Sequence, residues 1–291
     1  MLGVEDNETD LLVQCTFAAI TQWFPRSSAL RDIAVRLIHL SRYAQFLPSA
    51  IRRRLLGPWN GLLGWEQSLY ERRLYARFIK LGDLVFDIGA NLGGKSAAFL
   101  SLGAKVVAVE PNPNCIARLS KRFVREIDAG RLILLPAAIG RSAGRARLRQ
   151  FALDGGNASA SDIFTAVLEQ EFGAPSAVFE VEMIAGASLF ERFGMPAFIK
   201  IDVEGMDAEV LSTVPRRPRM LSFEFNLSPH LVAMNADCLV EVARLGFTEA
   251  NFTEAAGTQL LLREWVTPDR ILEEISRAAR GRALWGDVFV R

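Results

Sequence analysis

The spacing of apolar and polar positions changes near residue 80. Before this point, apolar residues recur at helical spacing and are interrupted at Pro25, Pro48 and Pro58, which predicts several helices joined by turns. After it, short runs rich in β-branched residues alternate with helical stretches, a rhythm typical of βαβ units around a parallel sheet. We therefore expect a helical N-terminal region over residues 1–80 and an α/β domain over residues 81–291.

Seven apolar runs of the second region have the length and composition of strands. The predicted strands are Leu84–Ile88, Lys105–Glu110, Leu132–Ala137, Phe198–Val203, Met220–Phe225, Phe247–Phe252 and Trp285–Val290. Helices are predicted over Lys95–Leu102, after the first strand, and over Pro268–Ala279, before the last. Residues 141–182 break the rhythm with an arginine-rich piece and a loop of small residues. They indicate an insertion at the ligand-binding edge of the sheet.

Composition narrows the class of protein without pointing to a partner. Half of the 291 residues are apolar and 23% are charged, which excludes a disordered chain and a disulfide scaffold. Lys and Arg total 34 against 33 Asp and Glu, so no overall field favours nucleic acid. The cysteines Cys15, Cys115 and Cys238 are odd in number and far apart in the sequence. We expect no disulfide framework, no metal site and no nucleic-acid partner.

The apolar stretch Leu11–Phe24 does not have the features of an export signal or a membrane anchor. It is too short to cross a bilayer, and polar residues interrupt it. Acidic residues precede it, and the first basic residue is Arg26, whereas a secretory signal begins with basic residues. We expect a cytoplasmic protein with no transmembrane segment.

A glycine turn follows the first predicted strand, with the sequence DIGANLG over residues 87–93. A strand, turn and helix in this order bring a nucleotide cofactor to backbone amides at a helix N-terminus. Glu110, at the end of the next strand, suits the hydroxyls of a ribose. A dinucleotide and S-adenosylmethionine (SAM) both use this geometry. Asn91 replaces the middle glycine of the dinucleotide fingerprint, and Asp87 would repel a pyrophosphate but suits a cationic amino group, so SAM fits better.

The sequence IKIDVEG over residues 199–205 places three ionisable residues at the end of the fourth predicted strand. Strand alternation puts Lys200, Asp202 and Glu204 on one side. Open α/β sheets bind their ligands at this edge. The acids would equally complement the dipole of the following helix, with Lys200 neutralising one of them. From the pattern alone, both interpretations stay open.

Together, DIGANLG (87–93), VEPNP (109–113) and IKIDVEG (199–205) resemble the FkbM family of SAM-dependent methyltransferases, over about residues 66–255. The resemblance implies a class I Rossmann-like methyltransferase fold, in which a mostly parallel seven-stranded sheet carries helices on both faces. It implies SAM as the cofactor and O-methylation of a hydroxyl on a sugar, glycoconjugate or other small metabolite. One departure is Ala185-Gly186-Ala187, where members usually carry Thr-Leu-Asp.

The resemblance also implies roles for individual residues. The implied cofactor-binding residues are Asp87, Gly89, Asn91, Gly93, Glu110, Ala137 and Ala138. The first four would form the cofactor loop, Glu110 would hold the ribose, and the alanines would leave room for adenine. Asp202 and Glu204 are the implied catalytic residues, facing the transferring methyl group. Glu224 and Glu71 are further candidates.

Three points remain expectations from the sequence. His230, beyond the fifth strand, is either a helix-start residue or a base for a hydroxyl acceptor. Trp285–Val290 should insert antiparallel between the fifth and sixth strands, as in the fold that the chain resembles. The expected partner is a small-molecule or carbohydrate acceptor.

Two alternative functions stay open. One is a SAM-binding protein without catalysis, which the departure at residues 185–187 would allow, and the other is an NAD-dependent oxidoreductase.

Overall fold

The computed structural model describes residues 71–151, 158–227, 231–254, 259–281 and 284–291. Most of the expected helical N-terminal region, with Leu11–Phe24, therefore lies outside the described residues, as do Cys15, His39 and His230. Of that region, residues 71–75 are described as helical. Among the described residues, no helix is both long enough and apolar enough to cross a membrane.

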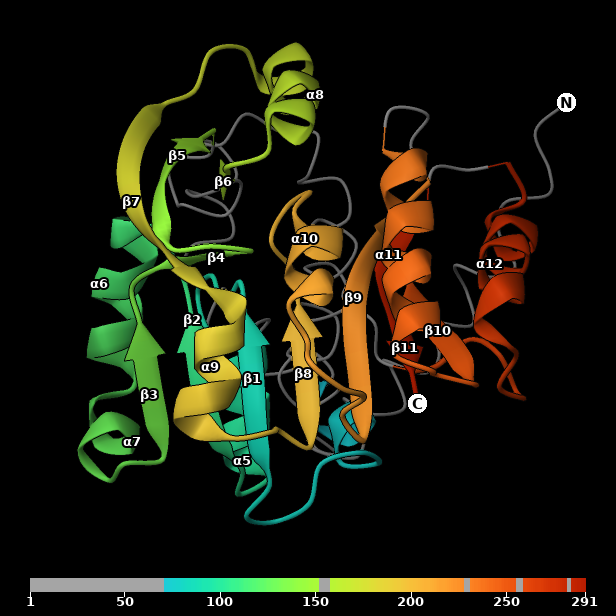
Figure 1. Cartoon of the computed structure of the whole chain (residues 1–291), viewed down its shortest axis with the longest axis horizontal. Coiled ribbons are helices and arrows are strands. Elements are labelled where there is room, and N and C mark those ends of the chain that lie inside the picture. The colour runs from blue at the N-terminus through green and yellow to red at the C-terminus, as the bar shows by residue number, and fades with distance from the viewer. Residues whose placement is uncertain (1–70, 152–157, 228–230, 255–258, 282–283) are drawn as a thin grey trace, which may run out of the picture. The chain divides into compact units, whose positions relative to one another are not determined.

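A seven-stranded sheet forms the centre of the described part of the chain (Figure 1). Its strands are β1 (Leu84–Ile88), β2 (Lys105–Val109), β3 (Leu132–Leu135), β8 (Phe198–Ile201), β9 (Met220–Asn226), β10 (Ala250–Glu254) and β11 (Trp285–Val290). The spatial order is β10-β11-β9-β8-β1-β2-β3. Strands β1, β2, β3, β8 and β9 pair in parallel, so their carboxyl ends meet at one edge.

The last strand is the one reversed strand of this sheet. β11 pairs antiparallel with β9 on one side and with β10 on the other, so Val288 lies opposite both Phe223 and Phe252. The expected insertion of Trp285–Val290 between the fifth and sixth strands is confirmed. The fold is the predicted class I Rossmann-like methyltransferase architecture, a mostly parallel sheet covered by helices.

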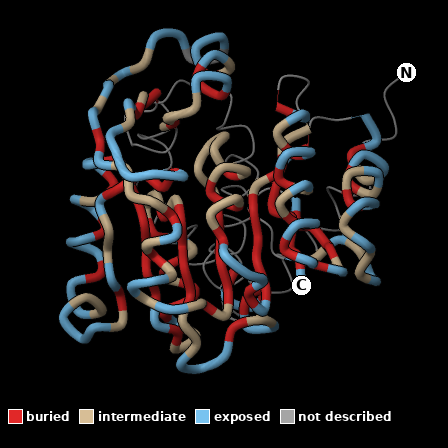
Figure 2. Tube along the Cα trace, viewed as in Figure 1, coloured by how far each residue is buried: buried red, intermediate tan, exposed pale blue. Residues whose placement is uncertain are grey.

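Two groups of helices cover opposite faces of the sheet. Residues 71–75, α5 (Gly94–Ser101) and α6 (Pro113–Arg122) pack on one face, where Tyr75, Phe99 and Phe198 are buried together. The helices on the other face are α9 (Gly186–Phe193), α10 (Asp207–Ser212), α11 (Val232–Arg244) and α12 (Ile271–Ala279). Short α7 (Val124–Asp128) precedes β3. Because both faces are covered, the central strands are buried along their length, as the red strands of Figure 2 show.

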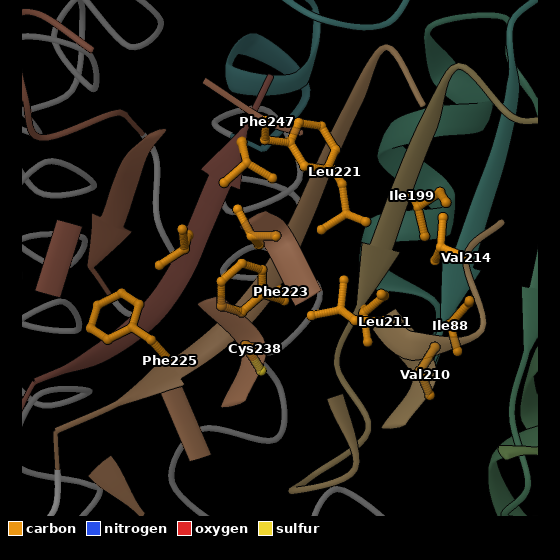
Figure 3. Close-up of a cluster of buried hydrophobic side chains, with 14 of the residues drawn as sticks. Ile88, Ile199, Val210, Leu211, Val214, Leu221, Phe223, Phe225, Cys238 and Phe247 are labelled. Carbon is orange, nitrogen blue, oxygen red and sulfur yellow. The ribbon is translucent and has the colours of Figure 1, made fainter. Parts of the chain in front are cut away.

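The larger apolar core lies between the sheet and α10 and α11. Figure 3 shows Leu211 of α10 and Cys238 of α11 beside Phe223 of β9. Cys238 is buried among these side chains and acts as a small apolar residue. Cys115 is also buried, so neither described cysteine lies in a reactive, open environment.

The segment predicted as an insertion over residues 141–182 builds a second sheet. Its strands, in the spatial order β4-β7-β5-β6, are β4 (Ala138–Gly140), β7 (Ala177–Ala185), β5 (Gly144–Gln150) and β6 (Ala158–Ser159). Helix α8 (Asp162–Phe172) follows β6, with the Ser161 side chain capping it through the Phe164 N–H. In Figure 1 this sheet lies beyond the carboxyl ends of β1, β2 and β3.

Several predicted boundaries are wrong by a few residues. The predicted strands Lys105–Glu110, Leu132–Ala137 and Phe198–Val203 end earlier, because the chain leaves the ladder to form the turns of the candidate site. Helix α5 begins at Gly94 rather than Lys95. The helix predicted over Pro268–Ala279 divides into a 3-10 turn (Pro268–Arg270) and α12.

The sixth predicted strand, Phe247–Phe252, is the largest of these errors, because β10 runs from Ala250 to Glu254. Phe247 is buried, but its N–H donates to the Val242 carbonyl oxygen at the end of α11. Its apolar side chain therefore closes the helix end rather than joining the sheet.

Candidate functional site

Turns from four parts of the main sheet enclose a cavity of about 90 Å³ at its carboxyl edge. They follow β1, β2, β3 and β8, and the second sheet adds Leu148, Ala158 and Ala160 to the wall. Of the nine residues predicted for the site, those lining this cavity are Gly89, Asn91, Glu110, Ala137, Ala138, Asp202 and Glu204. The fold thus brings together residues that lie more than a hundred positions apart in the sequence.

The glycine turn after β1 is wedged between its neighbours. The N–H groups of Gly89 and Ala90 both donate to the Val109 carbonyl oxygen of β2, at 2.9 and 3.0 Å. Gly89 has a φ of 85°, and a Cβ built there would lie 1.8 Å from the Asp202 carbonyl oxygen. A side chain at residue 89 would therefore collide with the turn after β8. Close approach of two turns is one reason for this glycine, in addition to the expected approach of a ligand.

Glu110 fixes the turns after β1 and β2. Its two carboxylate oxygens accept hydrogen bonds from the Asn91 N–H (2.7 Å) and the Asn112 N–H (2.8 Å). Asn112 in turn caps α6 through the Asn114 N–H. Burial raises the pKa of Glu110 to about 7, against the lowering effect of these hydrogen bonds. Each carboxylate oxygen has a second lone pair, so Glu110 can bind a ligand hydroxyl while it holds the turns.

Asp87 and Gly93 do not line the cavity. Asp87 is buried beneath the turn, where one carboxylate oxygen accepts the Ser96 hydroxyl at 2.5 Å, and burial raises its pKa to about 6. Gly93 precedes α5, and a Cβ there would lie 2.5 Å from side-chain carbons of Leu119 and Phe123. Both residues shape the turn from behind rather than contacting the cavity.

The ammonium of Lys200 joins two carboxylates from different strands. Its Nζ lies 3.2 Å from Asp202 Oδ2 and 2.9 Å from Asp287 Oδ1, and also donates to the Ile201 carbonyl oxygen. Burial alone would lower the pKa of Lys200, but Asp202 and Asp287 outweigh it and raise this pKa well above its usual value. Asp287 was not predicted as a site residue. The signal was an acidic residue inside the otherwise apolar strand WGDVFV.

The sequence predicted that Glu204 continues the side-chain alternation of β8, and this prediction is wrong. The strand ends at Ile201, and Glu204 has a left-handed φ of 51°. The Ser159 hydroxyl of β6 donates to the Glu204 carbonyl oxygen at 2.6 Å, which holds the turn against the second sheet. The side chain is half-buried in the cavity wall. Burial raises the pKa of Glu204 well above its usual value, and the charges of Asp202 and Asp207 raise it further.

The remaining candidates are not all near the cavity. Glu71 pairs with Lys95 at 2.9 Å and is buried on the α5 face of the sheet. Glu224 of β9 is close enough to Asp202 and Glu204 for their charges to raise its pKa, after burial as the main cause. Ala185-Gly186-Ala187 spans the start of α9, where Ala185 stands at the N-cap without a side-chain hydrogen bond. Neither the two glutamates nor residues 185–187 line the cavity.

Raised carboxyl pKa values make stability depend on pH. Asp87 and Asp207, each with a pKa of about 6, and Glu110, at about 7, hold protons that the unfolded chain releases near pH 4. Folded protein therefore binds more protons, and its stability falls as pH rises. We expect the free energy of unfolding to fall by roughly 2 kcal/mol between pH 6 and 8. Urea unfolding at both values measures it, and Glu110→Gln should reduce the slope. A rise in stability over this range would contradict the assignment.

The reversed last strand, the glycine turn and the cavity across β1, β2 and β8 define a SAM-dependent methyltransferase of the class I fold. A model described as the methyltransferase FkbM domain matches residues 87–248, more than half of the chain, and the chain belongs to this family. Membership of this family excludes the dinucleotide as the cofactor, and the cofactor is SAM.

One curated protein is similar to part of the chain. The chain is 38% identical over 74 residues to the "Probable ribosomal RNA small subunit methyltransferase A" of Methanospirillum hungatei, a match covering 24% of this chain and 29% of that protein. The chain thus spans less than a third of the length of this curated relative.

Similar solved structures include two methyltransferases. A TehB-like SAM-dependent methyltransferase from Corynebacterium glutamicum has a TM-score of 0.39 and 12% identity, covering 76% of this chain and 87% of that one. A SAM-dependent O-methyltransferase from Thermotoga maritima has a TM-score of 0.37 and 11% identity, covering 77% and 63%.

Proposed function

We propose that this methyltransferase transfers the methyl group to a hydroxyl oxygen of a sugar, glycoconjugate or other small metabolite, and that Glu204 takes the proton. The single observation that supports the proposal is the place of Glu204. Its half-buried carboxylate stands in the cavity wall, and burial with neighbouring acids makes it more basic than an ordinary carboxylate. Removing a proton from an alcohol calls for such a base.

The cofactor would occupy the cavity at the carboxyl edge of β1, β2 and β8. Bound SAM supplies a methyl group on a positively charged sulfur. Gly89 and Asn91 form the turn against which it would rest, and Glu110 would accept hydrogen bonds from ribose hydroxyls. Ala137 and Ala138 leave space for a flat ring. The carboxylate of Asp202, held by Lys200, adds negative charge for the cationic methionine end.

Glu204 and Asp202 would divide the remaining work between them. Asp202 is bound to a buried ammonium, so its orientation and charge are fixed. Within the described residues, Glu204 forms no ion pair, and it lies farther along the turn, where an acceptor hydroxyl would reach it. The proposed mechanism is an in-line displacement in which the protein aligns the acceptor and Glu204 removes the hydroxyl proton.

Incubation with methyl-labelled SAM and an extract of the source organism tests the reaction class. We expect label in a small or carbohydrate product that survives mild alkali, as an ether does and a carboxylate ester does not. Label that ribonuclease releases would contradict a small-molecule acceptor. SAM binding by calorimetry without any labelled product would favour the alternative of a SAM-binding protein that lacks catalysis.

Replacing Glu110 with alanine tests its proposed contact with the cofactor. We expect Glu110→Ala to weaken SAM binding by about 1–3 kcal/mol, because it removes an acceptor for ribose hydroxyls and frees the N–H groups of Asn91 and Asn112. The fold should survive, since no apolar packing is lost. Calorimetric titration measures the affinity, and circular dichroism checks the fold. Glu110→Gln, which retains one acceptor oxygen, is the matched control and should lose less. Unchanged SAM affinity in folded Glu110→Ala would remove Glu110 from the cofactor site.

A further inference from the structure

A second cavity, of about 190 Å³, lies on the other side of the turn that carries Glu204. Asp202, Glu204 and Met206 line the first cavity, whereas Gly205 and Asp207 line the second. The rest of its wall comes from the start of α8, the end of β9 and the first turns of α11. A molecule in this cavity would therefore reach the residues beside Glu204 from the side opposite the proposed cofactor.

The walls of the second cavity combine apolar side chains with carboxyl groups. Phe164 and Leu231 give apolar surface, and Asp207, Glu224 and Asp237 give three acids. Among the described residues that line it, none is basic. A wall that combines apolar side chains with several acids is suited to a ligand that carries both a carbon framework and a positive charge.

Asp207 has a carboxylate oxygen without a partner. Only 6% of this residue is exposed, and within the described part of the chain its Oδ1 accepts no hydrogen bond. Position at the start of α10 accounts for an acidic residue there, because carboxylates favour helix N-termini. It does not account for a buried, unpaired oxygen on a residue that lines a cavity, which costs free energy unless a donor reaches it.

The acids around this cavity outnumber the cations that could balance them. Burial is the main cause that raises the pKa of Glu224, and Asp202, Glu204 and Asp207 raise it further. The ammonium of Lys200, whose charge lowers the pKa of Glu224, is already bound to Asp202 and Asp287. A cationic ligand would supply positive charge at this place.

We propose that the second cavity is the acceptor subsite and that Asp207 and Glu224 bind a protonated amino group on a hydroxylated acceptor. The proposal rests on the proposed function, since it places an acceptor hydroxyl at Glu204. An ammonium donates three hydrogen bonds and carries the missing charge, whereas a hydroxyl donates one and carries none. The amino group stays protonated and is bound, not methylated. The substrate class is thus an amino sugar or a similar amino alcohol.

Binding of three matched sugars to the full-length protein tests this proposal. Ligand-observed NMR compares D-glucosamine with D-glucose and N-acetyl-D-glucosamine, which lack the charge, in the presence of S-adenosylhomocysteine. We expect glucosamine to bind at least about ten-fold more tightly than the other two. Equal binding of the three sugars, or no detectable binding of glucosamine, would overturn the proposal. Each titration is done with and without EDTA, and binding of glucosamine seen only without EDTA would assign the acids to a metal ion instead.

Two substitutions locate the effect. Asp207→Asn and Glu224→Gln keep side-chain size and should each remove most of the preference for glucosamine. Asp128→Asn, at the exposed end of α7 and the opposite edge of the sheet, is the matched control and should retain it. A preference that survives both cavity variants would overturn the assignment. SAM titration separates the two proposals: wild type that binds SAM normally but shows no preference for glucosamine refutes only the acceptor subsite, whereas wild type that fails to bind SAM refutes the proposed function.

Discussion

Glu204→Gln is expected to bind SAM like the wild type and to lose about 10²–10⁴ in turnover. Glutamine keeps the shape of glutamate but cannot take a proton. The cofactor cavity should keep its form, because the turn is held by its backbone: the Ser159 hydroxyl binds the Glu204 carbonyl oxygen, not its side chain. The left-handed backbone at residue 204 should not disfavour glutamine, because glutamate already adopts this conformation.

Single-turnover rates with an identified acceptor, together with SAM titrations, measure this effect. Asp202→Asn is the comparison, because it disturbs the pair with Lys200 and should impair both binding and turnover. If Glu204→Gln turns over like wild type while SAM binding weakens, Glu204 serves the cofactor. Glu224 would then be the next candidate for the base, because the charges of Asp202 and Glu204 raise its pKa. Glu71 is a weaker candidate, because it is paired with Lys95.

Deleting residues 284–291 should give insoluble protein. The deletion removes β11 from between β9 and β10, so two interior strand edges become exposed. It also removes the buried side chains of Val288, Phe289 and Val290, and it leaves Lys200 without Asp287. The soluble fraction after expression, compared with that of a variant lacking only Arg291, measures the effect. A soluble truncated protein that binds SAM would show that this strand is peripheral.

The parallel strands could be predicted because their runs are mostly apolar, and a strand buried on both faces has such a run in the sequence. The ends of strands left no such mark. Phe247 is as apolar as any strand residue, yet it packs at the end of α11. The pairing of residues 141–182 into a second sheet depends on contacts between distant segments, which a local pattern does not contain.

In the candidate site, too, local sequence patterns could be predicted, whereas contacts between distant segments could not. Gly89, Asn91 and Glu110 could be predicted because the turn and the following strand end lie close together in the sequence. The partners of Lys200 could not all be predicted, because Asp287 is 87 positions away and meets it only through strand order. Asp207 was not predicted as a site residue, and its unpaired oxygen becomes evident only from the structure.

The contact between Gly89 and the Asp202 carbonyl oxygen implies thermodynamic coupling between the two ligands. The turn that would receive the cofactor and the turn that would receive the acceptor touch through their backbones, so neither can shift alone. Ordering one turn by a ligand would then leave less to order when the second ligand arrives. Such coupling is reciprocal: if bound cofactor raises the affinity for the acceptor by some factor, bound acceptor raises the affinity for the cofactor by the same factor. We expect replacement of Gly89 to change this coupling factor in addition to the affinity for each ligand by itself.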